Sequence, residues 1–425
     1  MPVKMPNISA PKSLRNSVSQ PLKNLITIPY KLAKFEKIYL PNLKTTLSYQ
    51  IYETKDKLPK NWDDLGCKNV FLSKDYFEIL EKSAPSNMIC HYIGLFKDQD
   101  LVGIAISQFL DLNKLESFGD RDRCVRASVR KFILKNFASH VLLIGNNMLT
   151  GQNSFVFSDS ISAIEGIKTL KKATDALKSK FKSIGKKVHI TTFKDYTKKD
   201  VENFASDAFR KNYKYCVQPN MTFPIRDQWK SEQDYIDSLT KKYRDQYKRA
   251  RKKAEGIDKR KLHLEDIIRY ENTIYDLYHH VAQNAPFNTF FLTKNHFRIF
   301  KETLKDKFLF YGYFLDGNLI GFNTLIKNGN TIDTYFLGYD DTVQRDKMLY
   351  LNMLYDMIAY SINKGFKEII FSRTALEIKS SVGAKPIEMF GFMEHSNSKI
   401  NRHVPKIFPK LEPEIAWQER NPFKE

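Results

Sequence analysis

The chain contains nearly the same short hairpin twice. Residues 92–103 read YIGLFKDQDLVG, and residues 310–321 read FYGYFLDGNLIG. Each copy is typical of a strand, a tight turn with acidic and amide residues, and a second strand, with glycine at the same two positions. The copies are far apart and the residues between them differ, which indicates two whole domains of one fold rather than a short solenoid repeat.

The size and composition of the chain fit this interpretation. With 425 residues, the chain is long enough for two domains that each bury a core. A hydrophobic content of 42%, with 13% aromatic residues, is typical of a globular protein. No stretch approaches the roughly 20 uninterrupted apolar residues of a membrane-spanning helix, and the N-terminus lacks the apolar core of a signal peptide. We therefore expect a cytoplasmic protein without a transmembrane segment.

The chain is strongly basic, with 69 Lys and Arg residues against 48 Asp and Glu residues and a formal net charge of +21. Such an excess attracts polyanions, for example RNA, nucleotide phosphates or an anionic membrane surface. A lysine-rich proteome explains the same composition equally well, and both interpretations stay open.

The cysteine and histidine patterns predict no metal site. Cys67, Cys90, Cys124 and Cys216 form no CxxC pair, so we expect buried or half-buried small hydrophobic residues. None of the nine histidines has a metal-ligand spacing.

The elements around the two hairpins recur in the same order. In the first copy the pattern predicts strands at 88–97, 101–109, 141–144 and 154–157, a helix at 159–183 that stops at Gly185, and a strand at 188–193. In the second copy it predicts strands at 308–315, 319–326 and 331–338, a helix at 346–364 that ends at Gly365, and a strand at 366–371. We expect a flexible basic arm at 1–40, an N-terminal domain at 41–220 and a C-terminal domain at 221–425.

An antiparallel meander followed by a helix and a parallel strand predicts an α/β fold, with a mixed twisted sheet and helices on both of its faces. This order resembles the GNAT fold of acyl-CoA N-acyltransferases. The expected fold class is therefore α/β, with two tandem GNAT-like domains.

Two segments of the second half resemble Fem-like (FemAB-like) double-GNAT acyltransferases. The first is a basic amphipathic helix at 235–255, where residues 235–253 read YIDSLTKKYRDQYKRARKK. The second is 371–386, FSRTALEIKSSVGAKP, in which Lys379 and Gly383 match the lysine-to-glycine spacing of the family. The resemblance covers about 220–400 well, and 45–215 only by the order of elements.

The resemblance implies transfer of an acyl or aminoacyl group onto an amine. Fem enzymes take an amino acid from a charged tRNA and add it to a cell-wall precursor peptide, and other relatives use acyl-CoA or act on lipids. The implied donor is thus acyl-CoA or aminoacyl-tRNA, and the implied acceptor is an amine, with a cell-envelope precursor as one candidate.

The glycine-rich turn that holds the coenzyme A pyrophosphate in ordinary GNAT enzymes is missing at 344–349, which favours a tRNA-borne donor or a divergent CoA mode. Gln344, Arg345 and Lys347 at this place are candidate substrate-binding residues.

Acyl transfer needs a group that accepts a proton and positive charge near the carbonyl oxygen. The resemblance assigns the positive charge to Lys379, with a solvated loop lysine as the alternative. Arg373 is a candidate clamp for a phosphate or carboxylate, and Glu377 a candidate general base, unless the two form an ordinary surface pair. Tyr335 is a candidate acid and Tyr339 a candidate substrate contact, with packing as the alternative role for both.

The basic helix has two interpretations. As a polyanion-binding surface it uses eight residues: Lys241, Lys242, Arg244, Lys248, Arg249, Arg251, Lys252 and Lys253. Alternatively, it is a solvated helix between two domains. The rival to an acyltransferase is therefore a non-catalytic nucleic-acid-binding protein that reuses the duplicated fold.

Overall fold

Both predicted hairpins are present in the computed structural model, which describes residues 47–114, 137–284, 288–411 and 417–424. The first pairs β2 (Met88–Lys97) with β3 (Asp100–Asp111), and the second pairs β9 (Phe308–Leu315) with β10 (Asn318–Asn328). Both turns are tight because Asp98, Asp316 and Gly317 adopt positive φ angles of 57°, 50° and 80°. The predicted arm at 1–40 and Cys124 lie outside the described residues.

The hairpins continue in the same order in both halves. In the first half β4 (His140–Ile144) pairs antiparallel with β3, β5 (Phe155–Phe157) also pairs with β3, and α4 (Ala163–Ser183) leads to β6 (Ile190–Tyr196), which is parallel to β4. In the second half β11 (Thr331–Thr334) and β12 (Gly338–Tyr339) pair antiparallel with β10. The helix α12 (Leu349–Asn363) then leads to β13 (Glu368–Ser372), which is parallel to β11. Gly185 and Gly365 end the two helices with φ angles of 78° and 74°.

Two predicted boundaries in the second half are wrong. The chain leaves β11 after Thr334 and rejoins β10 only at Gly338, so the predicted strand 331–338 is two short strands. The predicted helix 346–364 begins at Leu349, after the short helix α11 (Asp341–Gln344), because Met348 has a left-handed φ of 47° that interrupts helical geometry.

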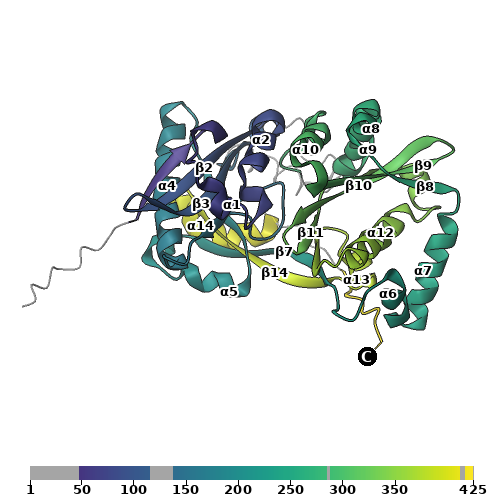
Figure 1. The fold of residues 1–425 in the computed structure, drawn as a ribbon. Coiled ribbons are helices and arrows are strands. Elements are labelled where there is room, and N and C mark those ends of the chain that lie inside the picture. Colours follow the sequence, from purple (N-terminus) through teal and green to yellow (C-terminus); the bar gives the residue numbers. More distant parts are fainter. Residues whose placement is uncertain (1–46, 115–136, 285–287, 412–416, 425) are drawn as a thin grey trace, which may run out of the picture. The chain divides into compact units, whose positions relative to one another are not determined.

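A single mixed sheet joins the two halves, in the order β1-β2-β3-β4-β6-β14-β7-β13-β11-β10-β9-β8. Its outer strands are β1 (Ser48–Tyr52) and β8 (Ile257–Lys261), and its central strands are β14 (Lys385–His395) and β7 (Tyr213–Pro224). The central strands are exchanged: β7 follows the first half but pairs with β13, whereas β14 follows the second half but pairs with β6 (Figure 1). The predicted domain boundary at 220/221 falls inside β7.

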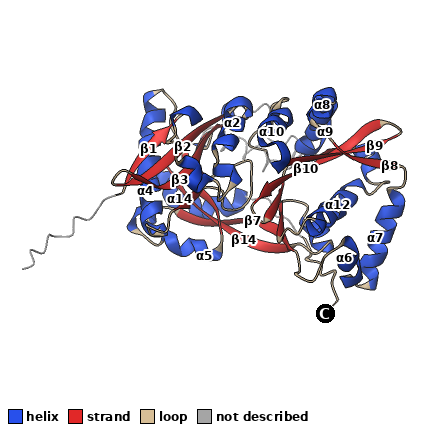
Figure 2. Ribbon diagram, in the orientation of Figure 1, coloured by secondary structure: helices blue, strands red, loops and turns tan. Residues whose placement is uncertain are grey.

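Helices cover both faces of the sheet, as predicted for the α/β fold with GNAT-like order in both halves (Figure 2). Successive residues of β2 point to opposite faces, so Tyr92 packs in a core with α1 (Trp62–Gly66) and α2 (Lys74–Ser83), whereas Ile93 packs against α4. The α2 core also includes residues of α8 (Leu264–Arg269), α9 (Glu271–Asn284) and α10 (His296–Leu304) from the second half. The remaining α-helices of the described residues are α5 (Lys198–Val201), α6 (Glu232–Ser238), α7 (Lys241–Lys253), α13 (Leu376–Ser381) and α14 (Ser398–Leu411).

The predicted basic helix at 235–255 is two helices, α6 and α7. The break falls at Leu239 and Thr240, whose backbones are extended. The C-terminal residues stabilise this break, because the Thr240 amide donates a 2.9 Å hydrogen bond to the Pro422 carbonyl and Leu239 forms a β-bridge with Phe423.

The described cysteines only partly match the predicted burial. Cys67 and Cys216 are exposed rather than buried, and Cys90 is half-buried. Among the described residues, no helix is both long and apolar enough to cross a bilayer.

Candidate functional site

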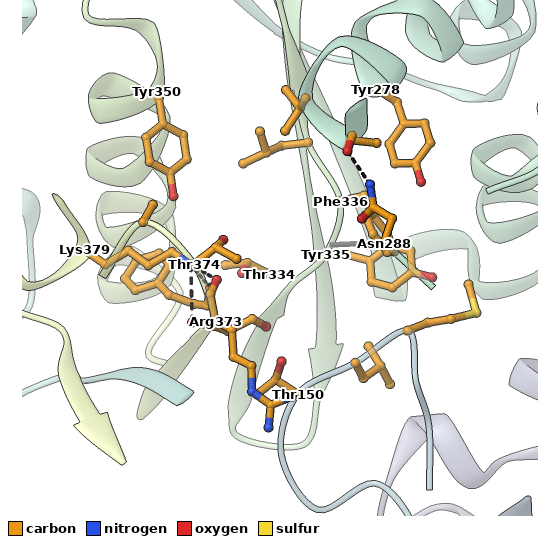
Figure 3. A pocket seen from close by; sticks show the side chains of 18 of the residues that line it. Thr150, Tyr278, Asn288, Thr334, Tyr335, Phe336, Tyr350, Arg373, Thr374 and Lys379 are labelled. Atoms are coloured by element: carbon orange, nitrogen blue, oxygen red, sulfur yellow. Dashed lines mark hydrogen bonds between the residues drawn. The ribbon is translucent and has the colours of Figure 1, made fainter. Parts of the chain in front are cut away.

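A cavity of about 510 Å³ lies where the parallel strands β11 and β13 diverge (Figure 3). The two strands are paired as far as Asp333 and Ile370, and the Thr334 hydroxyl donates a 2.9 Å hydrogen bond to the Ile370 carbonyl. Beyond this point the segments 334–337 and 371–375 both line the cavity, together with side chains of α9, α12 and α13 and the loop 147–150 of the first half. The carboxyl ends of parallel strands are a frequent place for ligand sites.

The loop after β13 has an unusual backbone. Ser372, Thr374 and Ala375 have φ angles of 61°, 69° and 47°, in the left-handed region that residues other than glycine rarely adopt. Each such residue costs on the order of 1–3 kcal/mol and persists only when its surroundings hold it in place. Strain of this kind is concentrated at functional sites, which supports the cavity as the candidate site.

Lys379 is the residue that holds this loop. Its Nζ atom donates hydrogen bonds to the carbonyl oxygens of Phe371 (2.6 Å), Ser372 (3.3 Å) and Arg373 (2.7 Å). Burial lowers the pKa of Lys379 to about 7, because only 4% of the residue is exposed. An ammonium has three N–H bonds, so none is left for an oxyanion in the cavity. The structure places Lys379 in the cavity wall, but its geometry supports a role in positioning the loop rather than the expected role at the carbonyl oxygen.

Arg373 presents its guanidinium to the cavity from the same loop. Its Nη2 group pairs with the Asp195 carboxylate, and its Nε donates a 3.0 Å hydrogen bond to the Gln218 carbonyl. Its Nη1 group makes no hydrogen bond within the described ranges, and 22% of the side chain is exposed. Figure 3 shows the guanidinium extending toward Thr150. Binding of an anionic group by Arg373 stays a prediction, and the geometry leaves the Nη1 group available for it.

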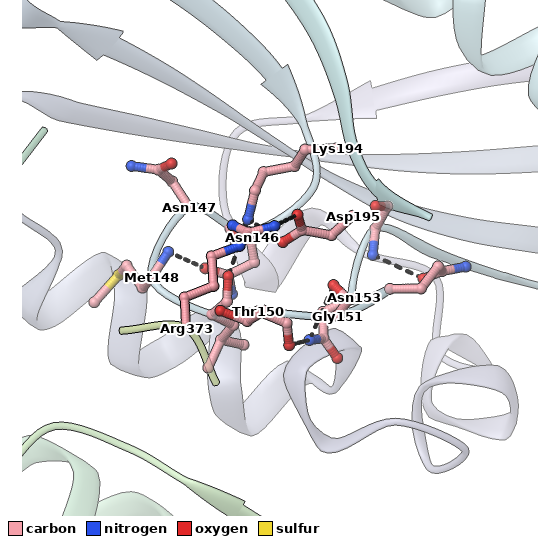
Figure 4. A network of polar contacts seen from close by, with 12 residues as sticks. Asn146, Asn147, Met148, Thr150, Gly151, Asn153, Lys194, Asp195 and Arg373 are labelled. Atoms are coloured by element: carbon pink, nitrogen blue, oxygen red, sulfur yellow. Dashed lines mark hydrogen bonds and ion pairs between the residues drawn. The ribbon is translucent and has the colours of Figure 1, made fainter. Parts of the chain in front are cut away.

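Asp195 belongs to a buried network at the end of β6 (Figure 4). The Lys194 Nζ lies 2.5 Å from Asp195 Oδ2 and donates to the carbonyls of Asn146 (3.0 Å) and Leu149 (2.9 Å). Burial lowers the pKa of Lys194, and the nearby Asp195 carboxylate partly opposes this effect. Asp195 lies between two cations, Lys194 and Arg373, and so connects the strand ends of the two halves.

The Arg373–Glu377 surface pair considered from the sequence does not form. Glu377 instead pairs with Arg420 of the C-terminal segment, whose Nε lies 3.1 Å from Glu377 Oε1. Glu377 is exposed and does not line the cavity. Its predicted role as a general base therefore has no support in the geometry.

Tyr335 and Tyr339 both line the cavity, but in different ways. The Tyr335 hydroxyl is 2.9 Å from His296 Nε2, and His296 Nδ1 is 2.9 Å from the Ser83 carbonyl. Because a carbonyl only accepts, we assign the hydrogen to Nδ1, so that Tyr335 donates to Nε2. Burial lowers the pKa of His296 to about 4 and raises that of Tyr335, which keeps the pair neutral. This arrangement favours a packing role for Tyr335, whereas Tyr339 is half-buried and accessible from the cavity.

The other three predicted substrate-binding residues lie outside the cavity wall. Gln344 ends α11 and Arg345 follows it at the surface. The Lys347 Nζ donates a 3.0 Å hydrogen bond to the Glu255 carbonyl, beyond the end of α7. The structure does not bring these residues together with Arg373.

Sequence reasoning missed Tyr350, Lys194 and Asp195. Tyr350 lies on α12 with Leu354 and Met357, one helical turn apart, and all three line the cavity. Its hydroxyl makes no hydrogen bond to a described residue and points toward Lys379 and Thr374 in Figure 3. The sequence did contain a signal for Tyr350, because α12 is apolar on two faces and such a helix must be buried on both.

Neither helix N-terminus fits the pyrophosphate of coenzyme A in the usual way. At α4 the Ser162 hydroxyl accepts from the Glu165 amide, and the Glu165 carboxylate accepts from the Ser162 amide at 3.3 Å, so the chain supplies its own anion there. At α12 the residue before the helix is Met348, and no glycine lets a phosphate approach the backbone. The donor and the way in which it binds therefore stay predictions.

The predicted polyanion-binding residues divide into two groups. Arg251 lies 2.8 Å from both Glu232 Oε1 and Asp356 Oδ1, and Arg244 donates to the Leu239 carbonyl at 3.2 Å. The other six are exposed on α7: Lys241, Lys242, Lys248, Arg249, Lys252 and Lys253. Within the described ranges no group of three His, Cys, Asp or Glu residues is arranged to hold a metal ion.

Comparison with known proteins found no matching family model and no matching curated protein. Similar solved structures include FemX, with 13% identity over 84% of this chain and 99% of that chain and a TM-score of 0.48. They also include a tandem GNAT protein from the clavulanic acid biosynthesis pathway, with 9% identity over 83% and 99% of the two chains and a TM-score of 0.46. L-PGS from Bacillus licheniformis is similar with 10% identity over 79% and 96% and a TM-score of 0.41. Likenesses this distant do not indicate what the chain binds or transfers.

Proposed function

We propose that this chain is an N-acyltransferase, which moves an acyl group from an activated ester or thioester onto an amine in the cavity at β11 and β13. One observation carries the proposal: a single cavity receives a partly free guanidinium, that of Arg373, and a tyrosine hydroxyl without a partner among the described residues, that of Tyr350. The strained loop beneath them is held by Lys379. Acyl transfer uses a positive hydrogen-bond donor near the carbonyl oxygen and a group that exchanges protons with the amine and the leaving group.

The proposed step begins when a neutral amine attacks the carbonyl carbon of the donor. A C–N bond forms and the carbonyl oxygen becomes negative, and the free Nη1 group of Arg373 donates hydrogen bonds to it. The bond to the leaving sulfur or oxygen then breaks. Tyr350 gives its proton to the leaving group and takes one from the attacking amine, so protons balance. Burial raises the pKa of Tyr350, which keeps this hydroxyl protonated before the step.

Donor and acceptor are proposed only by class. Acyl-CoA in a divergent mode and aminoacyl-tRNA are the donors that the sequence resemblance implies, and an amine, such as one on a cell-envelope precursor, is the acceptor. The six exposed cations of α7 suit contact with tRNA or with anionic lipid at a membrane surface. We also propose that the two halves arose by tandem duplication, since their elements follow the same order.

The same six cations support a second candidate function, which is binding of nucleic acid without catalysis. In this case α7 contacts a phosphate backbone and affinity falls steeply with salt. The Lys248→Gln, Lys252→Gln, Lys253→Gln triple variant then weakens RNA binding and lowers its salt dependence.

The experiment measures acyl transfer by mass spectrometry of the amine product, with a panel of acyl-CoAs and charged tRNAs as donors and a panel of primary amines as acceptors. Arg373→Gln is expected to reduce kcat about 100- to 1000-fold, the usual effect of losing one oxyanion donor. Arg210→Gln, the same change at an exposed arginine that does not line the cavity, serves as the matched control. Transfer that Arg373→Gln leaves intact would reject this site, and salt-sensitive RNA binding without any transfer would favour the second function.

A further inference from the structure

We infer that the acyl group accepted in this cavity is uncharged, apolar and several carbons long, and that a cationic aminoacyl group is excluded. This inference rests on the proposed N-acyltransferase function and narrows its donor class. The decisive feature is an apolar wall with positive side chains, in which none of the described residues is negatively charged.

The charged part of the wall is cationic. Among the described residues that line the cavity, three are basic (Lys194, Arg373 and Lys379) and none is Asp or Glu. Asp195 lies behind Arg373 and Lys194, and only 1% of its side chain is exposed. The α-ammonium of an aminoacyl group would therefore lose its hydration without gaining a carboxylate partner, which is strongly unfavourable.

Five backbone carbonyls at or beside the cavity already accept hydrogen bonds from buried lysines. The carbonyls of Phe371, Ser372 and Arg373 already accept from Lys379. The carbonyls of Asn146 and Leu149 already accept from Lys194. The two buried lysines thus occupy these five carbonyls, so an ammonium in the cavity would compete with them.

The apolar part of the wall is large. The face of α12 contributes Leu354, Met357 and the ring of Tyr350, and Phe371 and Ile378 adjoin it from β13 and α13. With its carbonyl oxygen at Arg373, an acyl chain extends along this face. An acetyl group, about the size of two water molecules of about 30 Å³ each, would leave most of the 510 Å³ cavity unfilled.

The test is a binding measurement that does not depend on turnover. Stable amide analogues of pantetheine thioesters, in which nitrogen replaces sulfur, are titrated by calorimetry in three forms: octanoyl, acetyl and 2-aminooctanoyl. The octanoyl compound should bind more tightly than the acetyl compound by up to about fourfold per buried methylene. The 2-aminooctanoyl compound differs only by its ammonium and should bind at least about tenfold more weakly than the octanoyl compound.

A variant pair tests the electrostatic argument directly. Thr374 lines the cavity at a φ of 69°, a conformation that Asp and Asn tolerate better than Thr, so both substitutions should fold. Thr374→Asp adds a carboxylate to the wall and should reverse the preference toward the 2-aminooctanoyl compound. Thr374→Asn has the same shape without charge and should keep the original order.

The outcomes separate this inference from the proposed function. Equal or tighter binding of the 2-aminooctanoyl or acetyl compound, or no binding of the octanoyl compound, would overturn the inference even if the chain transfers another acyl group. Tight, selective octanoyl binding supports the inference, and failure to transfer octanoyl from its thioester to any amine would then count against the transferase function alone.

Because acyl-CoA and acyl-carrier proteins share the pantetheine arm, octanoyl-CoA is included in the titrations. Tighter binding of octanoyl-CoA than of the analogue identifies CoA as the source, and equal binding shows that only the pantetheine arm shared with carrier proteins is recognised.

Discussion

The two halves of the sheet have the same element order, but their strand ends are used differently. In the second half β11 and β13 diverge around an open cavity, and Lys379 binds the carbonyls of its own loop. In the first half Lys194 crosses from β6 to the loop after β4 and fixes it over the corresponding end. The helix α4 of the first half is capped by the side chains of Ser162 and Glu165, whereas α12 of the second half has no side-chain cap. The ends of β11 and β13 therefore form the candidate site, and the ends of β4 and β6 support it. This difference arises from the loops rather than from the strands.

The largest expected effect on stability comes from removing the Asp195 carboxylate, which contacts cations of both halves. Asp195→Ala leaves Lys194 and Arg373 as buried or partly buried cations without their carboxylate, and should lower the free energy of unfolding by about 3–5 kcal/mol. Urea denaturation measures this. Asp227→Ala, which removes an exposed carboxylate paired with Lys367, should change stability little. Equal small losses in both variants would show that the halves do not depend on this link.

The next effect concerns the pH dependence that the second half contributes through Lys379. Its pKa is about 7 in the folded chain and about 10.4 when unfolded, so the unfolded chain binds more protons between these values and stability rises with pH there. The slope contributed by this lysine is at most about 1.4 kcal/mol per pH unit. Lys379→Met should remove it, as seen by urea denaturation at pH 7 and pH 9. Lys194, whose pKa is also lowered, should preserve part of the slope, and an unchanged slope in the variant would contradict the assignment.

A smaller effect tests the strain in the second half. Thr374→Asn should raise the free energy of unfolding by about 1 kcal/mol, because a β-branched residue is costly in the left-handed region and Asn is less so. Thermal denaturation measures the gain. Thr331→Asn, the same change within β11, should give none. A loss of stability at Thr374 would mean that the loop is not strained there.

The smallest effect tests the cap that distinguishes the first half. Ser162→Ala removes the hydroxyl that accepts from the Glu165 amide and should cost about 1 kcal/mol of stability. It should leave acyl transfer unchanged, because Ser162 does not line the cavity. Thermal denaturation and the transfer assay check both statements, and a variant that binds acyl-CoA more tightly would show that the cap had been excluding a phosphate.

Much of the fold was predictable, because hairpins, helix ends and the glycines at 185 and 365 depend on neighbours along the chain. The candidate site was only partly predictable. Arg373 was found in a motif, but its partner Asp195 lies 178 positions earlier, and no local pattern encodes that contact. The Glu377 partner, Arg420, is likewise on a separate segment. The break between α6 and α7 depends on Pro422 and Phe423, which the helical pattern of 235–255 does not contain.

The exchange of β7 and β14 has a consequence for how the chain can be divided. A cut in the loop between Pro224 and Glu232 gives a first fragment in which β6 lacks its neighbour β14, and a second in which β13 lacks β7. Each fragment then exposes an unpaired sheet edge that only the other can cover. We expect the two fragments to behave as the subunits of an obligate heterodimer, so that co-expression reconstitutes the fold where either piece alone aggregates.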